Sequence, residues 1–284
     1  MILVTGSTGR IGRDVVFGLV LKDVQMRVMM YGGAGQEWLH WSNVETVRGD
    51  YAKPETLDAA LVGIESAFMV SGPSPKQVEL QKNFIDACVR AGVKHVVKVS
   101  ALGAAADAPC RFLRWHAETE AQLAASGMRV TNLRPNGFSS NVRDQIESIR
   151  SGAIGSTLDP ATRISLVDTH DVADIAVAKL SERSGPSENI DITGPSALTQ
   201  VDVAELLTTI TKHPVAYKQF TPDEYRDVMK YAHVPAEVAA GVMELNTMYD
   251  AGFGSDVSDA TQRIAGHAPT PIKDYLTKLK SKLL

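Results

Sequence analysis

Three glycines near the start of the chain have the spacing of a phosphate-binding loop. The run reads Gly6-Ser7-Thr8-Gly9-Arg10-Ile11-Gly12, directly after a short apolar segment. Glycines in such a loop allow a tight turn and let the backbone approach a pyrophosphate, which the free N–H groups at the start of the following helix can bind. The spacing is G-x-x-G-x-x-G and differs from the G-x-G-x-x-G of many dehydrogenases. The motif predicts that residues 6–12 hold a dinucleotide.

Four residues further along the chain follow β-branched runs and are candidates for the same site. Asp50 and Tyr51 follow one run, and Ser71 and Gly72 follow the next. Ligands of open α/β sheets bind at the carboxyl ends of the strands, so all four are expected at the cofactor. The Asp50 carboxylate could accept a hydrogen bond from an adenine amino group. A turn or helix-cap role for Asp50 is the competing interpretation.

The segment that usually selects between NAD and NADP reads Met29-Met30-Tyr31-Gly32-Gly33. It lacks both the acidic residue that usually binds the ribose hydroxyls of NAD and the arginine that usually binds the extra phosphate of NADP. Arg10 and the backbone N–H groups of Gly32 and Gly33 could bind that phosphate instead, although Arg10 could also be a solvated surface charge. The sequence favours NADP(H) over NAD(H) and places Tyr31 in the cofactor site.

The elements that must position these residues alternate between short β-branched runs and helical segments. Several of the runs are almost wholly apolar, as strands buried on both faces of a parallel sheet are. This alternation predicts an α/β fold, a Rossmann-type doubly wound parallel sheet. The six predicted strands are Ile2–Thr5, Gln25–Met30, Val44–Arg48, Ser66–Val70, His95–Ser100 and Arg129–Arg134.

The second half of the chain has a looser pattern, and from Pro222 onward nearly all of it reads as helical. Short strands are expected near Ile164–Val167 and Val215–Phe220, and Asp171 is expected to be the N-cap of a helix. We predict a dinucleotide-binding Rossmann core over residues 1–137. Residues 138–284 are predicted to supply the remaining sheet-edge elements and a smaller, mostly helical substrate lobe.

The composition excludes several classes of protein. The chain has 284 residues and a net charge of −4, which argues against a nucleic-acid partner, because phosphates require a basic footprint. Its 2 cysteines are too few for a disulfide framework and fit a reducing cytoplasm. The sequence contains no run of 18 apolar residues, so no membrane span is expected. The N-terminus does not have the pattern of a signal peptide. The histidines lack H-E-x-x-H spacing, so no metal site is expected.

Together these motifs resemble the NmrA-like, atypical branch of the short-chain dehydrogenase/reductase superfamily over essentially the whole chain. Within that branch the overall pattern is most similar to bacterial NADPH-dependent quinone reductases and triphenylmethane-dye reductases. The resemblance implies a nicotinamide near Ser71, Ser100 and the Pro135–Phe138 loop, with Asn136 and Phe138 contacting the cofactor. The motifs that carry it are Val4–Gly12, Gly49-Asp50, Val99-Ser100, His116–Glu120, Leu133–Phe138 and Asp168–Ala173.

The helix that carries Tyr-x-x-x-Lys in typical members of the superfamily reads His116-Ala117-Glu118-Thr119-Glu120 here. Because residues four apart share one helical face, Glu120 is expected to orient His116 and hold it protonated, so that His116 acts as a proton donor. Ser100 could hydrogen-bond the substrate oxygen or the nicotinamide amide. A competing interpretation is that the His116–Glu120 pair only stabilises its helix.

The missing tyrosine puts ordinary ketone reduction in doubt but not hydride transfer. A quinone, an azo or triarylmethane dye, or an iminium group accepts hydride to give a delocalised anion or a neutral product, which needs little acid assistance. We therefore expect a cytoplasmic NAD(P)H-dependent reductase of a small conjugated electrophile. The alternative is a non-catalytic, NAD(P)-sensing regulatory protein. The sequence leaves both a monomer and a homodimer open.

Overall fold

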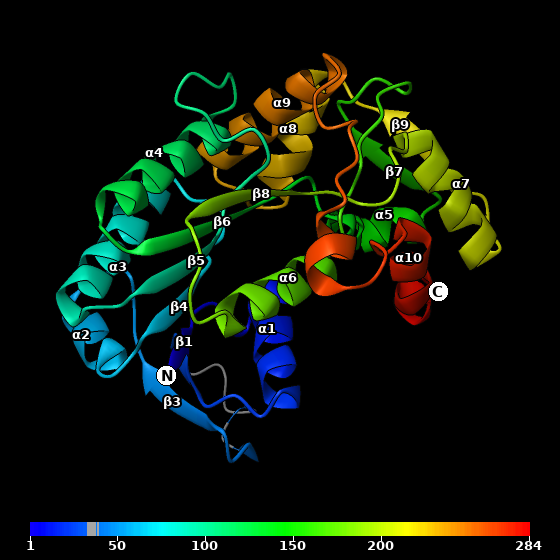
Figure 1. Cartoon of the computed structure of the whole chain (residues 1–284). Helices are drawn as coiled ribbons and strands as arrows, with labels where there is room; N and C mark the ends of the chain where they lie inside the picture. Colours follow the sequence, from blue (N-terminus) through cyan, green and yellow to red (C-terminus); the bar gives the residue numbers. More distant parts are fainter. Residues whose placement is uncertain (33–37, 39) are drawn as a thin grey trace.

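A seven-stranded sheet forms the centre of the computed structural model, which describes residues 1–32, 38 and 40–284. The strand order is β3-β2-β1-β4-β5-β6-β8, and every neighbouring pair is parallel (Figure 1). The order reverses between β1 and β4, so the predicted doubly wound sheet is confirmed. The strands are β1 (Ile2–Val4), β2 (Met26–Met30), β3 (Val44–Arg48), β4 (Ser66–Met69), β5 (His95–Val99), β6 (Arg129–Pro135) and β8 (Glu188–Ile192).

Helices cover both faces of this sheet. The helices α1 (Arg10–Leu21) and α6 (Thr169–Ser181) pack on one face, and α2 (Glu55–Leu61), α3 (Gln77–Ala91) and α4 (Arg111–Ala125) cover the other (Figure 1). Successive strand residues point to opposite faces, so Val97 enters the core beside α1 while Val96 enters the core beside α3. This two-sided burial is why the strands are so apolar.

The rest of the chain forms the predicted, mostly helical lobe around a small parallel pair, β7 and β9 (Figure 1). The elements differ from the prediction in detail. The strand expected near Ile164–Val167 does not form. Ile164 makes one antiparallel bridge to Leu198 and Val167 makes one parallel bridge to Phe138, and single bridges to two partners do not make a strand. The lobe contains η2 (Ser139–Gln145), α5 (Ile146–Arg150), β7 (Ala153–Ser156), α7 (Gln200–Thr211), β9 (Ala216–Gln219), α8 (Pro222–Tyr231), α9 (Ala236–Asp250) and α10 (Ile272–Leu283). The short helix η3 (Thr261–Ala265) packs instead on α6, beside the sheet.

The prediction that Asp171 caps its helix is wrong. The N-cap of α6 is Asp168, whose carboxylate accepts a hydrogen bond of 2.9 Å from the His170 N–H. A cap must precede the first helical residue and have an extended backbone, and Asp168 meets both conditions. Asp171 is buried in the first turn and accepts two 2.7 Å hydrogen bonds from the backbone and hydroxyl of Thr270. It therefore ties α6 to the segment that leads into α10.

An ionic contact between α1 and α6 predicts a pH-dependent term in stability. The ring of His170 lies 3.7 Å from the Asp14 carboxylate and 3.9 Å from that of Asp174. Hydrogen bonding to Asp14, with the nearby carboxylates, raises the pKa of His170 to about 9. The protonated form is favoured in the folded state, so its stabilisation is complete below the unfolded pKa of about 6.5 and disappears as the pH rises through 9.

The expected effect is small, because His170 is 57% exposed and its charge is screened. We expect His170→Gln to lower the free energy of unfolding by less than about 1 kcal/mol near pH 6 and by almost nothing near pH 10. Urea unfolding of both proteins at each pH measures this difference. A difference that is equal at the two pH values would contradict the prediction.

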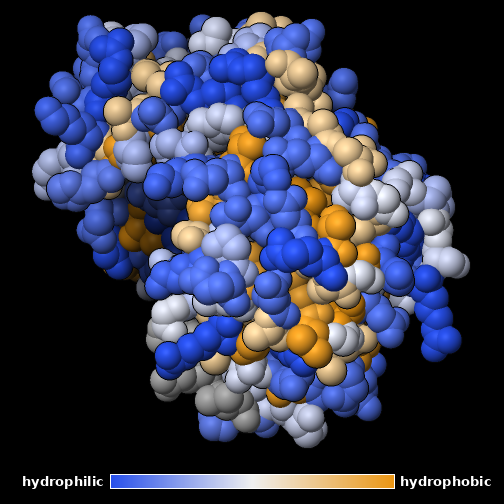
Figure 2. Space-filling model, turned by 90° about the vertical axis from the view of Figure 1, so that its left-hand side faces the viewer, coloured by the Kyte–Doolittle hydropathy of each residue, from blue (hydrophilic) through white to orange (hydrophobic). Residues whose placement is uncertain are grey.

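Three further features of the described residues concern the length of the helices, possible metal ligands and the surface. None of the described helices is long and apolar enough to cross a membrane. No group of His, Cys, Asp or Glu side chains in this described part of the chain gathers as a metal site would require. The face carrying α2, α3 and α4 is largely hydrophilic, with apolar side chains reaching the surface between hydrophilic ones (Figure 2).

Candidate active site

The glycine loop lies between β1 and α1, and packing explains two of its three glycines. Gly6 has a left-handed backbone (φ +61°), and a Cβ there would meet the Val70 side chain at 2.5 Å. A Cβ on Gly12 would lie 2.2 Å from the Gly6 carbonyl oxygen. A Cβ on Gly9 would meet only that same oxygen, at 3.2 Å. Packing therefore demands glycine at positions 6 and 12, whereas glycine at position 9 leaves the surface of the loop open.

The start of α1 fits the phosphates of a dinucleotide. Its N-cap is Gly9, which has no side chain to occupy the free N–H groups, and the first turn contains no acidic residue. The positive end of the helix dipole therefore faces outward at the exposed residues Thr8–Arg10. Ser7 and Ile11 are buried, with the Ser7 hydroxyl donating to the Met29 carbonyl oxygen at 3.3 Å. A cofactor role for these two residues would use their backbone.

The residues predicted at the adenine end lie at the carboxyl edges of β2 and β3. Asp50 folds back and accepts a hydrogen bond of 2.8 Å from the backbone of Ala52, as in the turn interpretation. The ring of Tyr51 stacks on that of Phe84 with centroids 4.8 Å apart, and its hydroxyl donates to Thr5 at 2.8 Å.

Burial raises the pKa of Tyr51, so its hydroxyl stays protonated. Tyr31 is 71% exposed and follows β2. Gly33 lies outside the described residues. Thr5, which sequence reasoning did not single out, bonds both Tyr51 and the backbone N–H of Val70, and so joins the end of β1 to the segments that follow β3 and β4.

Arg10 points from the glycine loop toward η2. Its guanidinium donates to Asp144 at 2.7 Å and to the Ser140 hydroxyl at 3.1 Å. These bonds hold a cation beside the phosphate-binding loop and connect the loop to the C-terminal lobe. Arg10 would have to release Asp144 to bind a phosphate of the coenzyme.

The loop after β6 is held by Asn136. Its buried side-chain amide donates to the Gly254 carbonyl oxygen at 2.8 Å and to the Ser165 hydroxyl at 3.0 Å, and its oxygen accepts from the Tyr249 hydroxyl at 3.0 Å. The amide thus has a structural role that the sequence did not predict. Phe138 is partly buried against the core beside α1. Any contact that Asn136 makes with the cofactor must come from its backbone.

Glu120 contacts Ser100 and Arg134. The Ser100 hydroxyl donates to one carboxylate oxygen at 2.5 Å, and the guanidinium of Arg134 binds both oxygens at 3.0 and 2.5 Å. The expectation that Glu120 orients His116 and holds it protonated is therefore wrong. Residues four apart share a helical face, but a two-pronged guanidinium is the stronger partner for a carboxylate.

His116 instead contacts Lys98, a residue that sequence reasoning missed. The Lys98 Nζ atom lies 2.9 Å from His116 Nδ1, and Lys98 is completely buried. The pKa of Lys98 is lowered to about 7, mainly by burial. The Glu120 carboxylate opposes this decrease, and the Arg134 guanidinium adds to it. Burial and the adjacent Lys98 lower the pKa of His116 well below its usual value, so this ring is neutral at pH 7. The available signal was a lysine between the valines of β5.

Ser71 and Gly72 follow β4 at the same edge of the sheet as Ser100. The Ser71 hydroxyl accepts a hydrogen bond of 2.8 Å from the Gln81 side chain on α3, and Gly72 is exposed. The structure thus brings the glycine loop, Ser71 and Ser100 to the carboxyl edge of one parallel sheet, where ligands of such folds bind.

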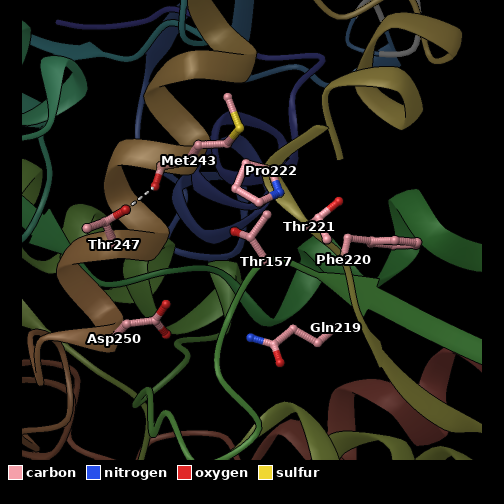
Figure 3. A pocket seen from close by; sticks show the side chains of 8 residues that line it. All are labelled: Thr157, Gln219, Phe220, Thr221, Pro222, Met243, Thr247 and Asp250. Atoms are coloured by element: carbon pink, nitrogen blue, oxygen red, sulfur yellow. Dashed lines mark hydrogen bonds between the residues drawn. The ribbon is translucent and has the colours of Figure 1, made fainter. Parts of the chain in front are cut away.

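A cavity of about 380 Å³ lies in the C-terminal lobe, between the β9–α8 junction and α9 (Figure 3). It includes none of the predicted cofactor residues. The helix α9 that forms one wall also carries Tyr249, which contacts Asn136, so this helix connects the cavity to the loop after β6. The lining residues are Thr157, Gln219, Phe220, Thr221, Pro222, Met243, Thr247 and Asp250.

Two solved structures have closely similar folds. The NADPH-dependent quinone oxidoreductase of Escherichia coli in complex with NADPH matches with a TM-score of 0.87 and 25% identity, over 98% of this chain and 99% of that chain. The triphenylmethane reductase of Citrobacter sp. matches with a TM-score of 0.86 and 23% identity, over 99% of each chain. At 23% identity, the similarity to the triphenylmethane reductase shows a shared fold.

Curated relatives cover nearly the full length. The NAD(P)H azoreductase of Xenophilus azovorans is 32% identical over 276 residues, spanning 97% of this chain and 96% of that protein. Quinone oxidoreductase 2 of Escherichia coli is 27% identical and spans 98% of both chains. The sequence pattern of the NmrA-like family matches residues 1–276. The predicted resemblance is thereby confirmed, and this chain belongs to the NmrA-like family.

Proposed function

We propose that this chain is an NAD(P)H-dependent reductase that transfers hydride to a small conjugated electrophile of the quinone, dye or imine type. The observation that carries the proposal is the glycine loop, where an uncapped helix start without acidic residues faces the carboxyl edge of the sheet. Two of its relatives are named as an NAD(P)H azoreductase and a quinone oxidoreductase, which supports reduction rather than cofactor sensing.

The proposed mechanism depends mainly on positioning. The bound dinucleotide would supply the hydride. The backbone of the Gly6–Gly12 loop would hold its pyrophosphate, with Asp50 and Tyr51 near the adenine. Ser71, Ser100 and the loop containing Phe138 would frame the nicotinamide. Holding an electrophile against a fixed hydride donor removes much of the entropic barrier to reaction. Glu120 would position the Ser100 hydroxyl through their 2.5 Å hydrogen bond.

A coenzyme oxidation assay tests this function. We expect the purified chain to oxidise NADPH with at least one member of a panel of quinones, azo dyes, triarylmethane dyes and cyclic imines, and to reduce simple ketones poorly. Loss of NADPH absorbance and formation of reduced acceptor are measured together. Coenzyme binding without turnover across the panel would instead favour the sensing function. Strong activity on simple ketones would contradict the proposed substrate class.

We propose NADP(H) as the preferred coenzyme, with one arginine of the glycine loop and one arginine near the end of β2 as candidates for its extra phosphate. Arg10 lies in the glycine loop, and Arg48 is exposed and pairs in register with Met30, the last residue of β2. The parallel register places the Arg48 side chain on the same face of the sheet as Met30.

We expect the substitution Arg10→Gln or Arg48→Gln to raise the Kd of NADPH about 5- to 10-fold, since one exposed charge contact contributes about 1 kcal/mol. The Kd of NADH, which lacks the phosphate, should stay nearly unchanged. Calorimetric titration with both coenzymes measures the difference. Equal weakening of both coenzymes by each variant would exclude phosphate recognition by these arginines.

The cytoplasmic location and the choice between monomer and homodimer stay predictions.

A further inference from the structure

Lys98 and His116 form a pair of nitrogen bases with no place in the hydride transfer proposed above. Lys98 lies on β5 and is completely buried, whereas His116 on α4 is partly exposed. The Lys98 Nζ atom is 2.9 Å from His116 Nδ1, a hydrogen-bond distance at which one nitrogen must donate and the other accept. Two cations this close in a buried site would repel strongly. The geometry therefore favours one proton shared between the two bases.

The other groups around the pair set its charge. Glu120 from α4 and Arg134 from β6 face it, and these two neutralise each other through their two-pronged ion pair. The neighbouring strands place the uncharged Met69 and Asn132 beside Lys98 in register. With burial lowering the pKa of Lys98 to about 7, the pair gains and loses its proton near neutral pH.

The second ring nitrogen of His116 points toward the start of α3. Its Nε2 atom is 3.5 Å from the side-chain nitrogen of Gln77, which can only donate, so this contact is not a hydrogen bond while Nε2 carries the ring hydrogen. Gln77 is the first residue of α3 and follows the loop that begins at Ser71. Ser100 follows Lys98 by two residues and so points to the same face of the sheet. Hence Nδ1 faces a buried proton source, and Nε2 faces the start of α3, the helix whose Gln81 bonds Ser71, where the nicotinamide is proposed to lie.

We propose that Lys98 and His116 form a proton relay for acceptors whose reduction leaves an anion, an inference that rests on the proposed reductase function. Hydride addition gives a quinone two electrons and one hydrogen and leaves a hydroquinone monoanion. The Nε2 proton of His116 passes to the phenolate oxygen while His116 Nδ1 takes a proton from the Lys98 ammonium. The imidazole stays neutral and changes tautomer, and the positive charge of Lys98 cancels the negative charge of the product. A solvent proton restores the ammonium after the product leaves.

The relay predicts a difference between two classes of acceptor. A quinone needs a proton after hydride transfer, whereas a triarylmethyl cation becomes neutral on receiving hydride and needs none. We expect Lys98→Met and His116→Asn each to lower kcat for a quinone about 10- to 100-fold, at or below the lower end of general acid catalysis, because the delocalised product anion needs less acid assistance than an alkoxide. Reduction of the cationic dye by NADPH should change little. Asparagine at position 116 can still accept a hydrogen bond from Lys98 but cannot relay a proton.

The pH profile gives a second readout. In the wild-type protein, kcat for the quinone should fall as the pH rises above about 7, the pKa of Lys98, because the pair then lacks its proton. The cationic dye should show no such decrease, and neither should the residual quinone activity of Lys98→Met. Lys94→Met is the matched control, since Lys94 is exposed at the start of the same strand segment and should behave as wild type.

Nitrogen NMR of the histidine-labelled apoprotein tests the shared proton without any turnover. We expect the His116 ring to stay neutral from about pH 6 to 9, with its hydrogen on Nε2 below the pKa of Lys98 and on Nδ1 above it. A cationic ring, or one tautomer throughout this range, would overturn the relay. In Lys98→Met the change of tautomer should be absent.

The kinetic outcomes separate the relay from a structural role and from failure of the proposed function. Equal loss of activity with both acceptors, or no loss with the quinone, would overturn the relay. Thermal unfolding and NADPH titration identify any variant that has lost its fold or its coenzyme site, and the remaining variant and the wild-type pH profile then decide the question. If neither acceptor is reduced by the wild type, the reductase proposal fails, and the histidine tautomer still tests the shared proton independently.

Discussion

The substitution Gly9→Val is expected to weaken NADPH binding at least about 100-fold, or ~2.7 kcal/mol, while the protein keeps its fold. Position 9 has φ −80° and ψ 170°, an extended conformation that valine adopts readily. The new Cβ would meet only the Gly6 carbonyl oxygen, at 3.2 Å, within the protein. The branched side chain would instead occupy the space over the α1 N-terminus, where the pyrophosphate is proposed to bind. Calorimetry gives the affinity, and thermal unfolding gives the stability.

The contrasting variant is Gly12→Ala. Its Cβ would lie 2.2 Å from the Gly6 carbonyl oxygen and 2.6 Å from the Gly6 carbonyl carbon, so the backbone between β1 and α1 must move. We expect it to cost about 3 kcal/mol or more of stability. If the two variants lost affinity and stability in parallel, the separation between a packing glycine and a ligand glycine would be wrong. Unchanged NADPH affinity in Gly9→Val would remove the glycine loop as the phosphate site.

Replacing Arg134 with methionine is expected to destabilise the protein by about 3–5 kcal/mol, because it leaves the Glu120 carboxylate buried without its ion-pair partner. The side chains of Glu120 and Arg134 are only 10% and 20% exposed, so water can replace the lost guanidinium only partly. In a chain of this size the expected fall in Tm is about 5–8 °C. Urea and thermal unfolding measure both quantities.

Two comparisons make the Arg134 prediction specific. Arg90→Met removes an exposed ion pair to Asp58 whose members are 51% and 59% exposed, and it should cost less than about 1 kcal/mol. The double variant Arg134→Met with Glu120→Gln removes the buried charge as well and should recover part of the loss. If Arg134→Met alone were as stable as Arg90→Met, the buried ion pair between Glu120 and Arg134 would not stabilise this fold.

Local patterns were sufficient to predict the framework of the protein. The β-branched runs and the G-x-x-G-x-x-G loop depend on period and on turn chemistry within a few residues, and both are read directly along the chain. Burial on both faces favours apolar residues in the central strands, so Ile2–Val4 and, despite its His95 and Lys98, His95–Val99 were recognisable without knowledge of their neighbours. The alternation of strand and helix then indicates a doubly wound parallel sheet, whereas the order of its strands is seen only in the structure.

The partners of the polar residues depended on the tertiary structure. Helical spacing predicted that Glu120 would bond His116, but β6 brings the Arg134 guanidinium to that carboxylate, and β5 brings Lys98 to the histidine. Asp171 was expected to cap a helix, yet its carboxylate bonds Thr270, 99 residues away in the chain. Spacing along one helix decides which side chains share a face. Which of them pair is decided by the groups that other strands and helices bring within hydrogen-bond distance, and those distances exist only after the sheet has assembled.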